Sequence, residues 1–252
     1  MRQPLWPTSP SPVSDKTSPE SAWKPFESPE KMALMPPKLR KAANALAVAV
    51  DELTALLSLY EIAITLSNGA FLKALEALPC RAAVDNCRVS VFASIIVGIV
   101  AMFDEDQKSV NLNRIAKVIL LPSEREAILD FHAQTSAEAK DDAARMLEKL
   151  KFLRRRMRAG RFPEAFRNLS QVRHQRFAHF DFVRGQGVVL LQLHDLRFCL
   201  VNAARLADLA CRVLVQRAYD LPRMRELARR DARELRAVIF TGAAERAPKA
   251  DP

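Results

Sequence analysis

The sequence LRKAANALAVAVDELTALLSLYEIAITLS, residues 39–67, is rich in alanine and leucine, and its apolar residues recur with the period of a helix. Asn68 and Gly69 follow it and are typical of a helix C-terminus. The same periodicity continues over nearly the whole chain after Lys38. Only 6 of the 252 residues are glycine and 7% are aromatic, which favours helices over strands. We therefore expect an all-α protein, a multi-helix bundle of long antiparallel helices.

Capping and breaking residues divide the rest of the chain into further helices. Ser123 and Glu126 have the spacing of a capping box, which predicts one long helix from there to about Arg158. Gly160 ends that helix, and Pro163 begins the next one. The expected helices cover residues 81–104, 111–120, 123–158, 163–184, 195–219 (capped by Asp195) and 222–240, with an extended or turn segment over 188–193.

Residues 1–37 differ in composition from the rest of the chain. They hold nine of the 15 prolines and both tryptophans, among serine, threonine and charged residues. Such a segment cannot form a packed core, so we expect a disordered tail, either idle or carrying a short docking peptide. A single helical domain is expected over 38–242 and a second disordered tail over 243–252. Met32 and Met35 are alternative start positions.

The cysteines and the most apolar run predict a cytoplasmic protein without a metal or cofactor. The four cysteines match no zinc or CxxC spacing, and we expect each to be a small core residue in a reducing compartment. No glycine-rich phosphate loop and no signal peptide are apparent. The run VSVFASIIVGIVAMF, residues 89–103, is shorter than the ~20 residues that span a bilayer, which predicts a buried central helix rather than membrane insertion.

The stretch RHQRFAHFD, residues 173–181, combines an anion-binding and a titrating side chain in one predicted helix. Arg173 carries a planar, permanent charge that suits phosphate oxygens, and His179 exchanges protons near neutral pH. Arg173 lies on or beside the apolar stripe of that helix, where an unpaired charge is costly. It therefore needs a partner: an acidic residue, for which the chain layout suggests Asp104, or a ligand phosphate. The stripe consists of Phe166, Leu169, Val172, Phe177 and Phe180.

Arg173, His174 and His179, in this order and late in a helical bundle, resemble the signature of the HEPN superfamily (higher eukaryotes and prokaryotes nucleotide-binding). The context FRNLSQVRHQRFAHFD and the upstream FDEDQKSVNLNRI, residues 103–115, are most similar to its abortive-infection, AbiU-type branch. The resemblance implies a metal-independent endoribonuclease, usually a homodimer whose two motifs face each other. It also implies the toxin of a toxin–antitoxin or phage-defence system, with an antitoxin protein as a partner.

RNA cleavage without a metal uses the 2′-OH as nucleophile and leaves a 2′,3′-cyclic phosphate. One group must accept the 2′-OH proton, another must protonate the leaving oxygen, and a cation must stabilise the phosphorane. We assign proton transfer to His179 and phosphate binding to Arg173. The second proton-transfer role falls to His179 of the partner subunit, to His174 or to water. The alternative is a non-catalytic HEPN-like module that binds nucleotide or RNA or acts as a scaffold.

The chain carries a formal net charge of +10, which is compatible with nucleic-acid binding. One basic cluster, from Lys149 to Arg161, ends the helix before the motif helix, and we expect its residues Arg154 to Arg158 within roughly 20 Å of Arg173. The RNA-binding candidates are Arg176 in the motif and Arg154, Arg155 and Arg158 in this cluster.

Other charged residues fit ordinary structural roles. A second basic cluster, over 223–236, is interrupted by acidic residues and predicts solvated salt bridges. We read neither basic cluster as interleaved with aromatic residues, and we therefore expect no stacking on nucleic-acid bases. His132 and His194 lack metal-ligand neighbours and are expected to be structural or surface residues. A helical DNA-binding regulator is disfavoured because no compact helix-turn-helix is apparent.

Overall fold

The computed structural model describes residues 34–76, 80–104, 111–174 and 193–245, and these residues form helices and no strand. The helices are α2 (Pro37–Leu66), α3 (Gly69–Leu75), α4 (Arg81–Phe103), α5 (Leu112–Ile119), α6 (Pro122–Ala133), α7 (Ala137–Arg158), α8 (Arg161–Val172), α9 (Leu193–Val215) and α10 (Leu221–Glu245). The prediction of an all-α fold is confirmed.

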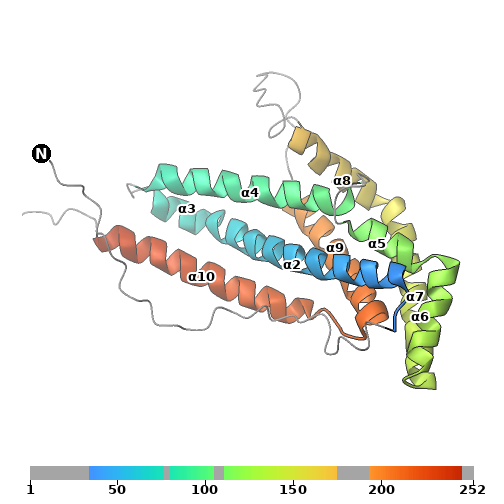
Figure 1. Cartoon of the computed structure of the whole chain (residues 1–252). Coiled ribbons are helices and arrows are strands. Elements are labelled where there is room, and N and C mark those ends of the chain that lie inside the picture. Colours follow the sequence, from blue (N-terminus) through green and yellow to red (C-terminus); the bar gives the residue numbers. More distant parts are fainter. Residues whose placement is uncertain (1–33, 77–79, 105–110, 175–192, 246–252) are drawn as a thin grey trace, which may run out of the picture.

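The long helices form a layer with α2 in its centre. α4 and α10 lie on either side of α2, and α9 crosses this layer (Figure 1). α4 runs antiparallel to α2, as expected for neighbouring long helices, whereas α10 runs in the same direction as α2. The parallel pair arises because α9 carries the chain back across the layer before α10 begins. The α5–α8 region lies at one end of the molecule.

α2 contributes one long apolar stripe to the core and ends close to the predicted residue. Leu46 and Leu53 on this stripe are fully buried. Asn68 follows the end of α2, and its Oδ1 accepts hydrogen bonds from the backbone N–H groups of Ala70 and Phe71 at 3.0 and 3.3 Å. It therefore caps the short helix α3, which the sequence pattern did not predict.

α4 packs closely on α2 but buries only one of its faces. A Cβ atom at Gly98 would lie 2.6 Å from Leu56 Cδ2, so glycine permits the close approach of the two helices. In the part of the chain that the structure describes, α4 is long and apolar enough to cross a membrane by length and composition, and 33% of its most apolar window is buried. Val89 and Val97 are exposed, so the expectation of a buried central helix is wrong for the outer face.

The helix expected over 123–158 is two helices, α6 and α7. The predicted capping box does not form: α6 begins at Pro122 with no side-chain cap. The chain leaves the helix at Gln134, and Ser136 Oγ then accepts the backbone N–H of Ala139 at 3.0 Å, which caps α7. Serine side chains compete with the helical backbone for hydrogen bonds, and here this competition ends one helix and begins the next.

α10 is held to α2 by a carboxylate that faces two arginines. Glu61 is 7% exposed and accepts hydrogen bonds from Arg225 Nη2 at 3.2 Å and from Arg229 Nε at 3.4 Å. Glu226 contacts Arg233, two helical turns along, at 3.2 Å. The second basic cluster is therefore extensively neutralised within the fold.

The four cysteines are free thiols in two different environments. Cys199 and Cys211 are buried in α9, as expected of core residues, and burial raises the pKa of the Cys199 thiol to about 12 and also raises the pKa of Cys211. Cys87 is exposed on α4, and Cys80 is partly exposed at its N-terminus. The expectation that all four belong to the core is therefore wrong for Cys87, whereas Cys80 packs against the small core cluster of Leu66, Phe71, Leu75 and Val84.

Candidate functional site

α8 carries the chain toward the predicted motif and is placed by aromatic packing. It begins at Arg161, two residues earlier than expected, after Gly160, whose φ of +74° lies in the left-handed region that favours glycine. The Phe162 and Phe103 rings meet edge to face with centroids 5.0 Å apart. Phe103 also meets the Phe166 ring edge to face, so the end of α4, next to Asp104, packs along α8.

Arg173 and Asp104 form an ion pair where α8 ends. Arg173 Nη1 lies 3.4 Å from Asp104 Oδ2, and the two side chains are 34% and 42% exposed. The partner suggested by chain layout is thus confirmed. The contact uses one of five N–H groups of the guanidinium, so a partly exposed face is left for an anion.

The structure describes the predicted motif only in part. Arg173 and His174 continue from α8, and His174 is exposed. The predicted catalytic His179 and the predicted RNA contact Arg176 lie outside the described residues. The expected helix over 163–184 is therefore described only as far as residue 174.

The basic end of α7 divides into inward and outward arginines. Arg154 is half-buried and donates through Nε to Asn113 Oδ1 at 3.0 Å, which ties α7 to α5. Burial, and then the charge of Arg158, lower the pKa of Arg154. Arg155 and Arg158 are exposed and form no salt bridge with any described residue.

Arg161, the last residue of this basic cluster, joins α8 to α9. Its Nη2 lies 2.8 Å from His194 Nδ1 and 3.3 Å from Asp195 Oδ1, and its guanidinium lies over the Phe198 ring. Asp195 also accepts a hydrogen bond from Asn168 at 3.3 Å. Asp195 was expected to cap α9 and instead lies buried in its first turn. The expected structural role of His194 fits this contact.

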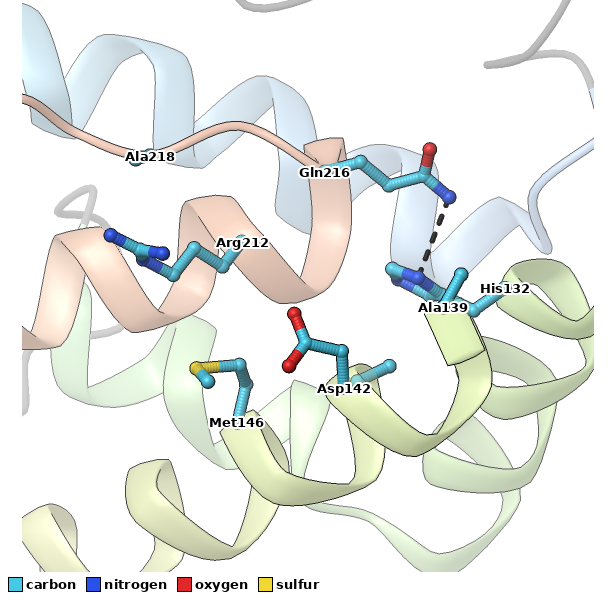
Figure 2. A pocket seen from close by; sticks show the side chains of 8 residues that line it. His132, Ala139, Asp142, Met146, Arg212, Gln216 and Ala218 are labelled. Atoms are coloured by element: carbon cyan, nitrogen blue, oxygen red, sulfur yellow. Dashed lines mark hydrogen bonds between the residues drawn. The ribbon is translucent and has the colours of Figure 1, made fainter. Parts of the chain in front are cut away.

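A pocket of about 210 Å³ lies between α6, α7 and the end of α9 (Figure 2). His132 Nε2 lies 2.8 Å from the Val213 carbonyl oxygen, and Gln216 donates to His132 Nδ1 at 3.4 Å, so both ring nitrogens have partners. Gln216 has a φ of +56°, a strained conformation for a residue other than glycine. These contacts confirm a structural role for His132.

The charges around this pocket are also paired. A hydrogen bond from Arg145 lowers the pKa of Asp142, and Arg212 contacts Asp208 through Nε at 3.0 Å. The pocket thus offers a ligand no unpartnered charge. Among the described residues, no group of three or more His, Cys, Asp and Glu side chains is placed to hold a metal ion.

No protein-family model, curated protein or solved structure matches this chain. Two features stand out among the described residues: Arg173, one-third exposed at the end of α8, and the unpaired cations at the end of α7.

Proposed function

We propose that this protein is a metal-independent endoribonuclease whose site includes Arg173, His174 and His179. The observation that supports this proposal is the state of Arg173, which is one-third exposed and held by a single 3.4 Å contact with Asp104. Buried polar groups are nearly all hydrogen-bonded, whereas Arg173 is partly exposed and most of its N–H groups have no partner among the described residues. Arg173 keeps most of its donors for another anion.

Asp104 orients the guanidinium in the absence of RNA. Its carboxylate is 42% exposed, so water solvates it well and its hold on Arg173 is weak. A phosphate carries two acceptor oxygens in a geometry that matches the arginine fork, and it can replace or join the carboxylate. The ion pair therefore holds the Arg173 side chain at little cost to phosphate binding.

The proposed reaction transfers a phosphoryl group within one RNA strand. The 2′-oxygen forms a bond to phosphorus as its proton passes to a base, and the bond from phosphorus to the 5′-oxygen breaks as an acid protonates that oxygen. Arg173 neutralises the charge that develops on the non-bridging oxygens. One histidine cannot be acid and base at once, so a homodimer supplies a second His179, or the exposed His174 takes one role.

The biological setting follows from the HEPN-like motif alone. A ribonuclease of this kind fits a cytoplasmic toxin of a toxin–antitoxin or phage-defence system, restrained by an antitoxin protein. The formal charge of +10 suits an RNA substrate. Arg155 and Arg158, exposed at the end of α7, supply contacts to the RNA backbone, and Arg176 supplies another within the motif.

The test is RNA cleavage by purified protein in the presence of a chelator. Wild-type protein should produce 2′,3′-cyclic phosphate ends, and Arg173→Ala and His179→Ala should each reduce the rate by at least about 100-fold. Arg167→Ala is the matched control, because Arg167 is an exposed arginine of the same helix and should be dispensable. Equal rates in all variants would refute the assigned site.

A non-catalytic HEPN-like module is the second candidate, and the Asp104 contact favours it. If Arg173 serves only to join α8 to the end of α4, its charge is already satisfied inside the fold. This alternative predicts RNA or nucleotide binding without any cleavage in chelator. It also predicts that Arg173→Ala lowers stability rather than the rate of a reaction.

A further inference from the structure

The outer face of α7 exposes an aromatic ring among positive charges. Phe152 is 65% exposed, and it is the one aromatic residue among the exposed large hydrophobic side chains of the described chain. The core-facing residues of α7 include Leu147 and Leu150, both fully buried, and Phe152 lies off that seam. Its ring is available to a binding partner.

Three cations surround Phe152 at helical spacing. Lys149 lies three residues before it, and Arg155 and Arg156 lie three and four residues after it, so their side chains share its face. All three are exposed, and none forms a salt bridge or a side-chain hydrogen bond with another described residue. The nearby carboxylate of Glu148 is already engaged by Arg125 at 2.7 Å and lies 3.8 Å from Lys151.

The basic face of α7 contrasts with that of α10. On α10, Arg225 and Arg229 bind Glu61, and Arg233 binds Glu226. These three arginines of α10 are therefore neutralised by carboxylates. A helix C-terminus favours basic residues through its dipole, which accounts for arginines near the end of α7. The dipole gives no reason for an exposed phenyl ring among them.

We propose that the outer face of α7 binds single-stranded nucleic acid, with Phe152 stacking on a base and Lys149, Arg155 and Arg156 contacting the flanking phosphates. A positively charged surface with an aromatic platform is the chemistry that recognises unpaired strands. In a duplex the flat faces of the bases are covered by their neighbours, so the ring cannot stack on them. The choice of RNA over DNA rests on the proposed ribonuclease function. The proposal of a stacking surface does not depend on that function.

The cluster from Lys149 to Arg161 contains an exposed aromatic residue, contrary to the interpretation from the sequence; base stacking itself stays a proposal. Phe152 stands inside the basic cluster from Lys149 to Arg161, and the apolar seam through Met146, Leu150 and Leu153 bypasses it. An apolar residue off the seam and beside cations was the signal available in the sequence.

The test is fluorescence anisotropy with a short labelled RNA, single-stranded or annealed to its complement, in chelator and in a His179→Ala background that removes the proposed cleavage. Phe152→Ala should weaken binding of the single strand by about 5- to 150-fold, the range that loss of one stacked base implies. Phe152→Tyr should retain wild-type affinity, and Phe152→Leu should not, because stacking needs an aromatic ring. Binding of the duplex should be unchanged by all three.

Val238→Ala is the matched control, because Val238 is 67% exposed on α10 and should not affect RNA binding. Arg156→Gln should reduce the salt dependence of binding by about 0.7 in log–log slope, as expected for one lost phosphate contact to a single strand. Wild-type affinity in Phe152→Ala, rescue by Phe152→Leu, or an equal loss for the duplex would overturn the proposal. The proposal would also be overturned if the Phe152→Ala variant no longer bound vesicles of anionic phospholipid but still bound RNA with wild-type affinity.

This experiment separates the binding surface from the nuclease. Binding that depends on Phe152, in a wild-type protein that cleaves no RNA, would support the α7 surface and refute the ribonuclease. Cleavage that is lost in Arg173→Ala, together with RNA binding that is unchanged in Phe152→Ala, would support the ribonuclease and refute the α7 surface.

Discussion

The pair formed by Arg173 and Asp104 can be tested by a double-mutant cycle on stability. Two unit charges 3.4 Å apart attract by about 1.2 kcal/mol in water, and the exposure of both side chains places this pair close to that limit. Ordering two flexible side chains opposes the attraction. We therefore expect a coupling free energy of about 0.2–1 kcal/mol, as for other exposed pairs.

The cycle consists of wild type, Asp104→Ala, Arg173→Ala and the double variant, each unfolded in urea. Each single variant should lose less than about 1.5 kcal/mol with an unchanged m-value, and the coupling should shrink in concentrated salt. Asp104→Asn should bind RNA a few-fold more tightly than wild type, because it removes a negative charge beside the arginine that receives the phosphate.

A coupling free energy above about 2 kcal/mol would contradict this reasoning. Such a value is typical of a desolvated pair whose partners depend on each other. Arg173 would then be a structural residue, and loss of RNA cleavage in Arg173→Ala would report damaged folding. Weaker RNA binding by Asp104→Asn would likewise count against Arg173 as the phosphate-binding group.

Three further predictions concern groups buried in the core. Glu61→Ala should lower the free energy of unfolding by about 1–3 kcal/mol, because it leaves two arginines without their shared acceptor; a change below about 0.5 kcal/mol in urea unfolding would contradict this. Cys199 and Cys211 should resist a thiol reagent at pH 8 while Cys87 reacts, and all four thiols should react after denaturation, as mass spectrometry can show. Burial raises the pKa of Tyr219 from 10.0 to about 12, so the fold favours the neutral phenol. The raised pKa should contribute about 2–3 kcal/mol to the free energy of unfolding below pH 10, and this contribution should be lost between pH 10 and 12. Urea unfolding at a series of pH values would refute this if stability stayed constant over that range.

Most of the helical elements could be predicted from periodicity, and the errors have physical causes. The bounds of α2, α4 and α5 follow from apolar spacing and lie within about two residues of the predicted ends. The break between α6 and α7 could not be predicted in this way, because Ser136 suits either a helix interior or a cap. Tertiary packing of both helices decides between them.

The candidate site was predictable only where the cost of an unpaired charge pointed to a partner. Arg173 beside an apolar stripe required an anion, and Asp104 supplied it. Arg154 and Arg161 gave no such signal, because an arginine at the end of a helix fits water equally well. Their partners, including Asn113, come from helices distant in sequence, which only the packed fold brings together.

The two proposals together set a length requirement for the substrate. α8 has 12 residues and separates the basic end of α7 from Arg173 by about 18 Å along its axis. An RNA strand that stacks on Phe152 and is cleaved beside Arg173 must reach from one residue to the other. Phe152→Ala should therefore raise the KM for long RNAs and leave the KM for RNAs of a few nucleotides unchanged. An equal increase for both lengths would mean that Phe152 acts through the folding of α7 and not through a bound base.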